Sequence, residues 1–143
     1  MKISKKFILI TILFGVPAFL LGRVIWVDPV NAMTPTALQL PLFIFLSVLE
    51  AVAFGSGIAF LILGWPFLKK LTSKNHHGVE GAFIAIAWML VSWWPHDNMH
   101  RANGENLSGL FRIEYLFHFT LIVSAFVIAR FFWQLLKESH NTR

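Results

Sequence analysis

The stretch WWPHDNMH, residues 93–100, ends the third of four long apolar segments and carries two histidines and an acid. The residues before it are almost entirely apolar, which is typical of a helix that crosses a membrane. A short polar turn comes after it, and the fourth apolar segment then opens with Glu114 and His118, four residues apart. Polar, ionisable side chains therefore gather where two apolar segments meet.

The composition indicates an integral membrane protein. The chain has 143 residues, of which 57% are hydrophobic and only 13% charged, whereas soluble domains have roughly 45–50% apolar and ~25% charged residues. The net charge of +5 comes from short basic clusters between the apolar runs. We therefore expect the lipid bilayer, and not nucleic acid, as the partner. The absence of cysteine excludes disulfides, thiol catalysis and iron–sulfur ligation by thiolates.

The apolar pattern predicts an all-α fold, a four-transmembrane-helix bundle in a single domain that covers residues 1–143. The expected spans are residues 7–26, 44–67, 79–98 and 111–136. The first could instead be a cleaved leader, but its apolar run of about 20 residues has spanning length, whereas a leader core has ~7–15. The third is only about 16 residues, or ~24 Å, to Trp94. We therefore expect it to continue past Pro95.

Lysine and arginine in the short loops predict the orientation. The basic head of the chain, residues 69–74 and residues 137–143 alternate correctly for four spans, so both termini are expected to be cytoplasmic in a multi-pass protein of the cell (inner or plasma) membrane. Two local features are also expected. Pro41 should kink the second helix, and the small residues 55–57 should mark a close helix crossing.

On this frame the ionisable side chains converge from four segments at the extracytoplasmic end. An ionisable group at mid-span costs ~2.5–3.5 kcal/mol, and such groups are functional candidates by default. The cost is lower near the membrane edge, so the convergence is the stronger argument. The group consists of Arg23, Glu50, His96, Asp97, His100, Glu114 and His118.

The spacing of these residues favours a metal site. Residues i and i+4 share a face of a helix, so His96 pairs with His100, and Glu114 with His118. Three imidazoles with carboxylates suit a divalent transition metal, zinc, iron or copper. We expect His96, His100 and His118 as ligands, and Asp97 as a further ligand or as an acceptor that orients a histidine. Met99 would be a soft ligand if the ion were copper.

Two glutamates are the candidate catalytic groups. Glu114 is expected to be a fourth ligand or a general base, and Glu50 to bond to the ligands or to carry protons. Each residue also has a plainer interpretation. The histidines at 96 and 100 could be solvated loop residues, and Asp97 could form only a surface ion pair with Arg101. His118 could bond to a backbone carbonyl and Glu50 to a neighbouring helix.

The sequence leaves three functions open. The first is a membrane protein whose His/carboxylate metal site could be catalytic. The second is a b-type haem protein for electron transfer, with His100 and His118 as axial ligands. The third is a non-catalytic accessory or transport subunit, in which the polar cluster only binds a loop of a partner or relays protons. Other membrane subunits, or further copies of this chain in a homo-oligomer, are the partners that we consider.

Overall fold

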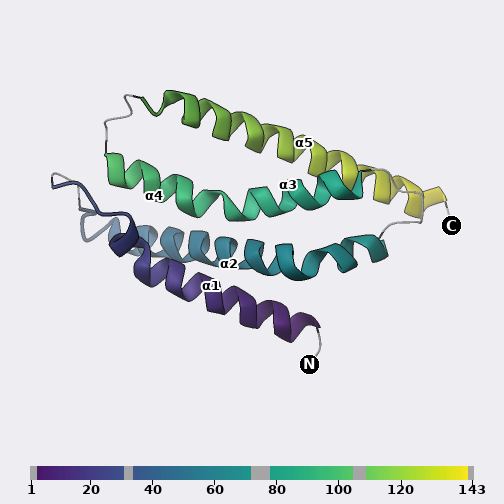
Figure 1. Ribbon diagram of the computed structural model, residues 1–143, viewed down its shortest axis with the longest axis horizontal. Helices are drawn as coiled ribbons and strands as arrows, with labels where there is room; N and C mark the ends of the chain where they lie inside the picture. The colour runs from purple at the N-terminus through teal and green to yellow at the C-terminus, as the bar shows by residue number, and fades with distance from the viewer. Residues whose placement is uncertain (1–2, 31–33, 72–77, 105–108, 142–143) are drawn as a thin grey trace.

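The computed structural model describes residues 3–30, 34–71, 78–104 and 109–141, without the side chains of 139–141. These residues form five helices, and the all-α prediction is confirmed. Helices α3 and α4 follow each other end to end, so the chain forms four rods that lie in the order α1, α2, α3–α4, α5 (Figure 1). Their bounds are α1 Ile3–Ile25, α2 Leu40–Leu71, α3 Val79–Val91, α4 Trp93–Asn103 and α5 Phe111–Asn141.

Three of these helices are long and apolar enough to cross a membrane: α1, α2 and the part of α5 from Phe111 to Glu138. They coincide with the first, second and fourth expected spans. Helix α2 has 32 residues, a length of about 48 Å, and is longer at both ends than expected. The expected third span, residues 79–98, is different, because it is divided between α3 and the first half of α4.

The backbone remains helical from α3 into α4, but one backbone hydrogen bond is missing where the two helices meet. Ser92 has φ −76° and ψ −24°, which is right-handed helical backbone, and its N–H donates to the carbonyl of Trp88. The next turn continues, since the N–H of His96 donates to the carbonyl of Ser92. Pro95, however, has no N–H to donate to the carbonyl four residues before it. The third rod is therefore bent at Ser92 and remains one rod.

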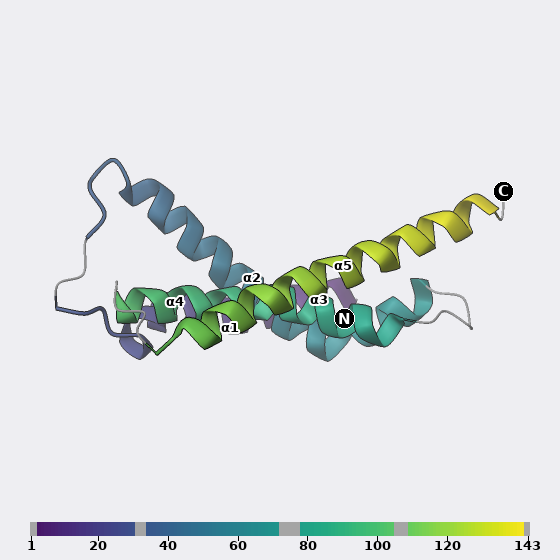
Figure 2. The same ribbon diagram turned by 90° about the horizontal axis from the view of Figure 1, so that it is seen from above.

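The expected kink at Pro41 is not formed, because Pro41 stands in the first turn of α2. Its missing N–H would have no partner within the helix at that position. The first half of α2 nevertheless diverges from the other rods (Figure 2).

Glycines allow α2 to approach both of its neighbours closely, which confirms the crossing predicted at residues 55–57. A Cβ at Gly55 would collide with the backbone carbonyl oxygen of Thr11 in α1. A Cβ at Gly57 would lie 2.9 Å from the Cβ of Leu90 in α3. Because small residues let helix backbones come together, packing of this kind holds helices side by side in a membrane.

Helix α3 is held between α2 and α5. Phe60 and Leu68 of α2 are buried with Ala82 of α3 and Phe131 of α5. A polar contact adds to this packing, as the indole N–H of Trp88 donates to Thr120 Oγ1 at 3.1 Å. The beginnings of α1 and α3 and the ends of α2 and α5 lie toward one end of the bundle (Figure 1). Helix α4 and the beginning of α5 lie at the other end.

Candidate metal centre

One face of α4 carries the two histidines toward the first turns of α5. His96 and His100 are one turn apart, and their rings contact each other edge to face with centroids 4.5 Å apart. The ring of Phe117 in α5 stacks on His96 at 3.5 Å between centroids and 7° between planes. Because the side chain of His96 is only 11% exposed, this stacking fixes the direction of its Nε2 atom.

The carboxylate of Glu114 in α5 contacts both histidines of α4. Its Oε2 atom is 3.0 Å from His96 Nε2 and 2.7 Å from His100 Nε2. The two Nε2 atoms are 3.2 Å apart. Without an ion, each ring can donate its N–H to the same oxygen; in the other tautomer, the same nitrogens offer lone pairs to a metal.

These three atoms form a triangle that has the dimensions of a metal site. The ligand atoms of His96, His100 and Glu114 lie within 4.8 Å of one another, and among the described residues they form the group that could hold a metal ion. Bonds of about 2.0–2.2 Å to a tetrahedral zinc ion place neighbouring ligand atoms roughly 3.3–3.6 Å apart. The triangle needs to widen by only a few tenths of an ångström on two sides, and slightly more on the third.

His118 approaches the same carboxylate from its other side. Its Nδ1 atom lies 3.1 Å from Glu114 Oε1 and 2.9 Å from the backbone carbonyl of Glu114. The side chain is 55% exposed. The expected pairing of Glu114 with His118 is therefore present. The imidazole of His118 is not part of the triangle, because it contacts the other carboxylate oxygen of Glu114.

Asp97 and Glu50 are not brought to the histidines. Their side chains lie near each other, where α2 and α4 are adjacent. Residues 96 and 97 differ by about 100° around the helix, which turns Asp97 toward α2 while His96 faces α5. Glu50 therefore lies beside a residue of a neighbouring helix and apart from the histidine rings.

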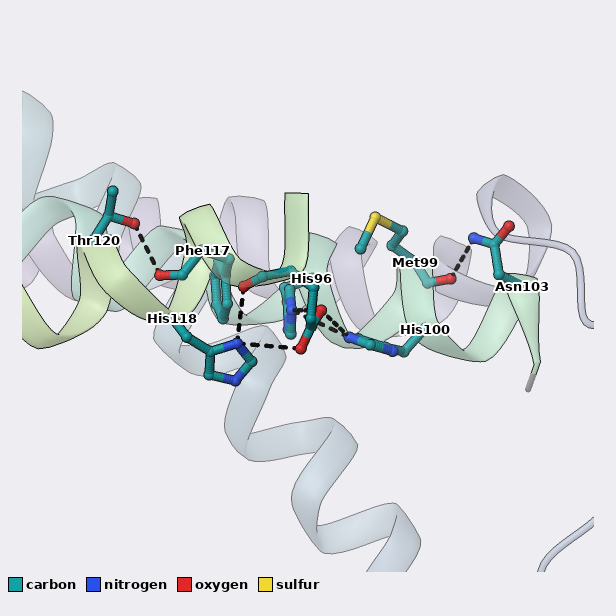
Figure 3. A network of polar contacts seen from close by, with 8 residues as sticks. His96, Met99, His100, Asn103, Phe117, His118 and Thr120 are labelled. Atoms are coloured by element: carbon teal, nitrogen blue, oxygen red, sulfur yellow. Dashed lines mark hydrogen bonds and ion pairs between the residues drawn. The ribbon is translucent and has the colours of Figure 1, made fainter. Parts of the chain in front are cut away.

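Met99 is also directed away from the triangle. Figure 3 shows its sulfur on the far side of α4 from the histidine rings, and its carbonyl accepts a hydrogen bond from Asn103 Nδ2. No role was predicted for Phe117 from the sequence, although its spacing of three residues from Glu114 places both on one face of α5.

An ion pair that was not predicted from the sequence ties α4 to the chain after α1. Arg101 Nε lies 3.0 Å from Asp28 Oδ1, and Arg101 also donates to the side-chain oxygen of buried Asn98. From the sequence, Asp97 was the partner considered for Arg101. The structure pairs Arg101 with Asp28 instead, because the segment that carries Asp28 lies against α4.

Comparisons with protein-family models, with curated protein sequences and with solved structures give no match to this chain. Its function is therefore inferred from the helices and the side-chain geometry. They define a helical protein with three long, apolar helices that could span a membrane and a His/His/Glu cluster that could hold a metal ion.

Proposed function

We propose that this chain is a small integral membrane metalloprotein in which His96, His100 and Glu114 bind a divalent transition metal. The observation that carries the proposal is the triangle of their ligand atoms, with sides of 2.7, 3.0 and 3.2 Å. Surface carboxylates often cluster without an ion, but here two imidazole nitrogens converge on one carboxylate oxygen. In this proposal the chain has four spans, the third made by α3 and α4, and both termini are cytoplasmic.

The charge distribution supports this orientation. Lys5 and Lys6 lie in the first turn of α1, Lys69 and Lys70 in the last turn of α2, and Lys137 is near the end of α5. These elements meet at the end of the bundle opposite α4 (Figure 1). Positive side chains mark the cytoplasmic side, so the metal centre is extracytoplasmic.

The ligand set favours zinc or iron(II). Two histidines and a carboxylate form catalytic zinc sites with a fourth position for water, and the same set forms non-haem iron sites with open positions. Copper with a methionine ligand is less well supported, because Met99 is directed away. Either favoured metal would activate a bound water or an oxidant. Glu114 acts as a ligand here, and His118 can supply a fourth ligand if its ring turns away from the Glu114 carbonyl.

Haem is not the function that the geometry supports best. A haem with His100 and His118 as axial ligands would need the macrocycle between the two rings. The carboxylate of Glu114 occupies that space, with its two oxygens 2.7 Å from His100 Nε2 and 3.1 Å from His118 Nδ1.

The test is to purify the chain in mild detergent, measure its metals and record an absorbance spectrum. About one zinc or iron per chain is expected, lost in His96→Ala and in Glu114→Gln. Met99→Leu is the matched control, because it changes a residue of the same helix that points elsewhere and conserves volume. A chain that takes up no metal when titrated with Zn²⁺ or Fe²⁺ would overturn the proposal, and a Soret band would favour haem.

A further inference from the structure

A cavity of about 260 Å³ lies between the start of α3 and α5, toward the end of the bundle opposite the metal centre (Figure 1). The cavity is smaller than the ~300–1,000 Å³ that sites for small molecules occupy. It therefore fits one compact polar group, and not a whole lipid or cofactor. The residues of its α5 wall share one face of the helix, and they are Val127, Arg130, Phe131 and Gln134.

The opposite wall of the cavity consists of two glycines, Gly78 and Gly81. A Cβ at Gly78 would meet nothing within 4 Å, and a Cβ at Gly81 would contact Val127 at 3.6 Å, an ordinary distance. Phe131, of which only 2% is exposed, lies on the buried side. The glycines therefore leave open space beside the polar side chains of α5, and a bound group can occupy it.

Arg130 gives this cavity a positive charge. Among the described residues that line the cavity, it is the one charged side chain. Arg23 and Arg101 approach the carboxylate of Asp28 at 3.9 Å and 3.0 Å, whereas Arg130 forms no ion pair with a described residue. Gln134, one turn further along α5, is half-buried and adds an amide that can donate. A guanidinium and an amide without a carboxylate beside them suit an anion.

Arg130 lies within the apolar part of α5. The candidate span of this helix continues to Glu138, which is about 12 Å further along the axis. A charged side chain at that depth is costly unless it meets an opposite charge or extends to the membrane surface. The side chain of Arg130 is exposed. In a bilayer, the molecules that reach it from outside the chain are therefore lipids.

The surroundings of the cavity indicate which lipids these are. Lys69 and Lys70 of α2 and Lys137 of α5 lie toward the same end of the bundle (Figure 1), which is cytoplasmic in the proposed orientation. Anionic lipids of the cytoplasmic leaflet gather at basic clusters of this kind. Phe126 and Trp133, one turn to either side of Arg130, are 72% and 69% exposed. They offer an apolar surface for acyl chains outside the cavity.

We propose that this cavity binds the phosphate of an anionic phospholipid from the cytoplasmic leaflet. A guanidinium bonds to two phosphate oxygens at once, and Arg130 is placed to do so while Gln134 donates to one of them. A zwitterionic phospholipid fits less well, because no acidic side chain among the described lining residues receives its ammonium group. The proposal uses the membrane orientation given above and does not depend on the metal centre.

The experiment is native mass spectrometry of the full chain in detergent, with a metal chelator present and with phosphatidylglycerol or phosphatidylcholine of the same acyl chains as the titrant. One phosphatidylglycerol per chain is expected to bind about fivefold more tightly than phosphatidylcholine, or better. Equal affinities for the two lipids would overturn the proposal. Millimolar inorganic phosphate should leave the phosphatidylglycerol bound. Displacement by inorganic phosphate would assign the cavity to a free phosphate and overturn the lipid.

Two matched pairs of variants test the location. Arg130→Gln should abolish the preference for phosphatidylglycerol, whereas Arg112→Gln, at the other end of α5, should retain it. Val127→Phe places a ring in the cavity and should weaken binding without a change of charge, whereas Val123→Phe, one turn earlier and outside the lining, should not. Equal losses within either pair would show that the lipid binds to the surface at large. Lipid and metal binding are measured separately, so either proposal can fail alone.

Discussion

The Nε2 atom of His100 lies 2.7 Å from the Oε2 atom of Glu114 and so joins α4 to the first turn of α5. The two residues are 14 positions apart in the sequence, and the rings of Trp93 and His96 in α4 contact Phe117 of α5 beside them. These side-chain contacts together hold the beginning of α5 against α4. This relationship makes Glu114 the most informative residue to change.

Glu114→Gln should lower the affinity for Zn²⁺ by about 100-fold or more, because an amide oxygen is a much poorer zinc ligand than a carboxylate. The variant keeps nearly the same size and can still accept a hydrogen bond from one histidine. Competition with a chromophoric chelator would measure the affinity. Equal affinity in Glu114→Gln and in the unmodified chain would remove Glu114 from the ligand set.

His118→Ala tests the fourth position. If His118 turns onto the ion, the variant should still bind one metal but about tenfold more weakly, since three ligands remain. Chelator competition beside Glu114→Gln would rank the two residues. Unchanged affinity would mean that the ring stays on the backbone carbonyl of Glu114, 2.9 Å away, and that water fills the position.

Metal binding should weaken as the pH falls. Imidazole binds a metal only in its neutral form, so protons compete with the ion for His96 and His100. Histidines change their charge between pH 5 and 8, and the loss should therefore be steep below about pH 6. Calorimetric titrations in buffers with different ionisation enthalpies would count the protons released. A pH-independent affinity between pH 5 and 7 would contradict ligation by the histidines.

The close approach of α1 and α2 predicts that an alanine at Gly55 destabilises the protein, whereas an alanine at Gly81, away from this crossing, does not. Gly55→Ala should destabilise the protein by about 1–3 kcal/mol, because the added Cβ collides with the carbonyl of Thr11 and the helices must separate. Gly81→Ala is the control, since its Cβ would meet Val127 at 3.6 Å, an ordinary contact. Thermal unfolding in detergent would compare them. Equal midpoints for both variants would argue against the crossing.

The hydrogen bond between Trp88 and Thr120 should contribute about 0.6 kcal/mol, the average for such bonds between membrane helices. A double-mutant cycle with Trp88→Phe and Thr120→Val isolates this contribution from the ring packing that each substitution also changes. The measurement is the free energy of unfolding in mixed micelles. A coupling energy of zero would mean that Trp88 and Thr120 do not form this hydrogen bond in the folded protein.

The sequence predicted the helices better than it predicted the contacts between their ends. Apolar length alone located the three helices that could span a membrane, because a bilayer demands long apolar runs whatever lies beside them. The break at Ser92 was not predicted as a helix end. The span was expected to continue past Pro95. The helical path does continue, but it bends near Ser92 because Pro95 has no N–H to donate to the carbonyl four residues before it.

The candidate site was predicted only in part, because spacing in the sequence gives the contacts within one helix but not the contacts between helices. Spacing along one helix correctly paired His96 with His100 and Glu114 with His118. Asp97 was grouped with them by its nearness in sequence, although one residue is a rotation of about 100°. That Glu50 meets Asp97, and Asp28 meets Arg101, depends on how α1, α2 and α4 are packed, which no spacing within a single segment encodes.

Helix α4 has only 11 residues, yet it presents the histidines to α5 and Trp94, Asn98 and Arg101 to α1 and α2. The bend at Ser92 separates this short element from the rest of its rod. If α4 turns about its axis, both faces turn through the same angle. An ion that fixes His96 and His100 against Glu114 therefore also fixes the face that α4 turns toward α1 and α2, so metal binding and the packing of α4 on these helices stabilise each other.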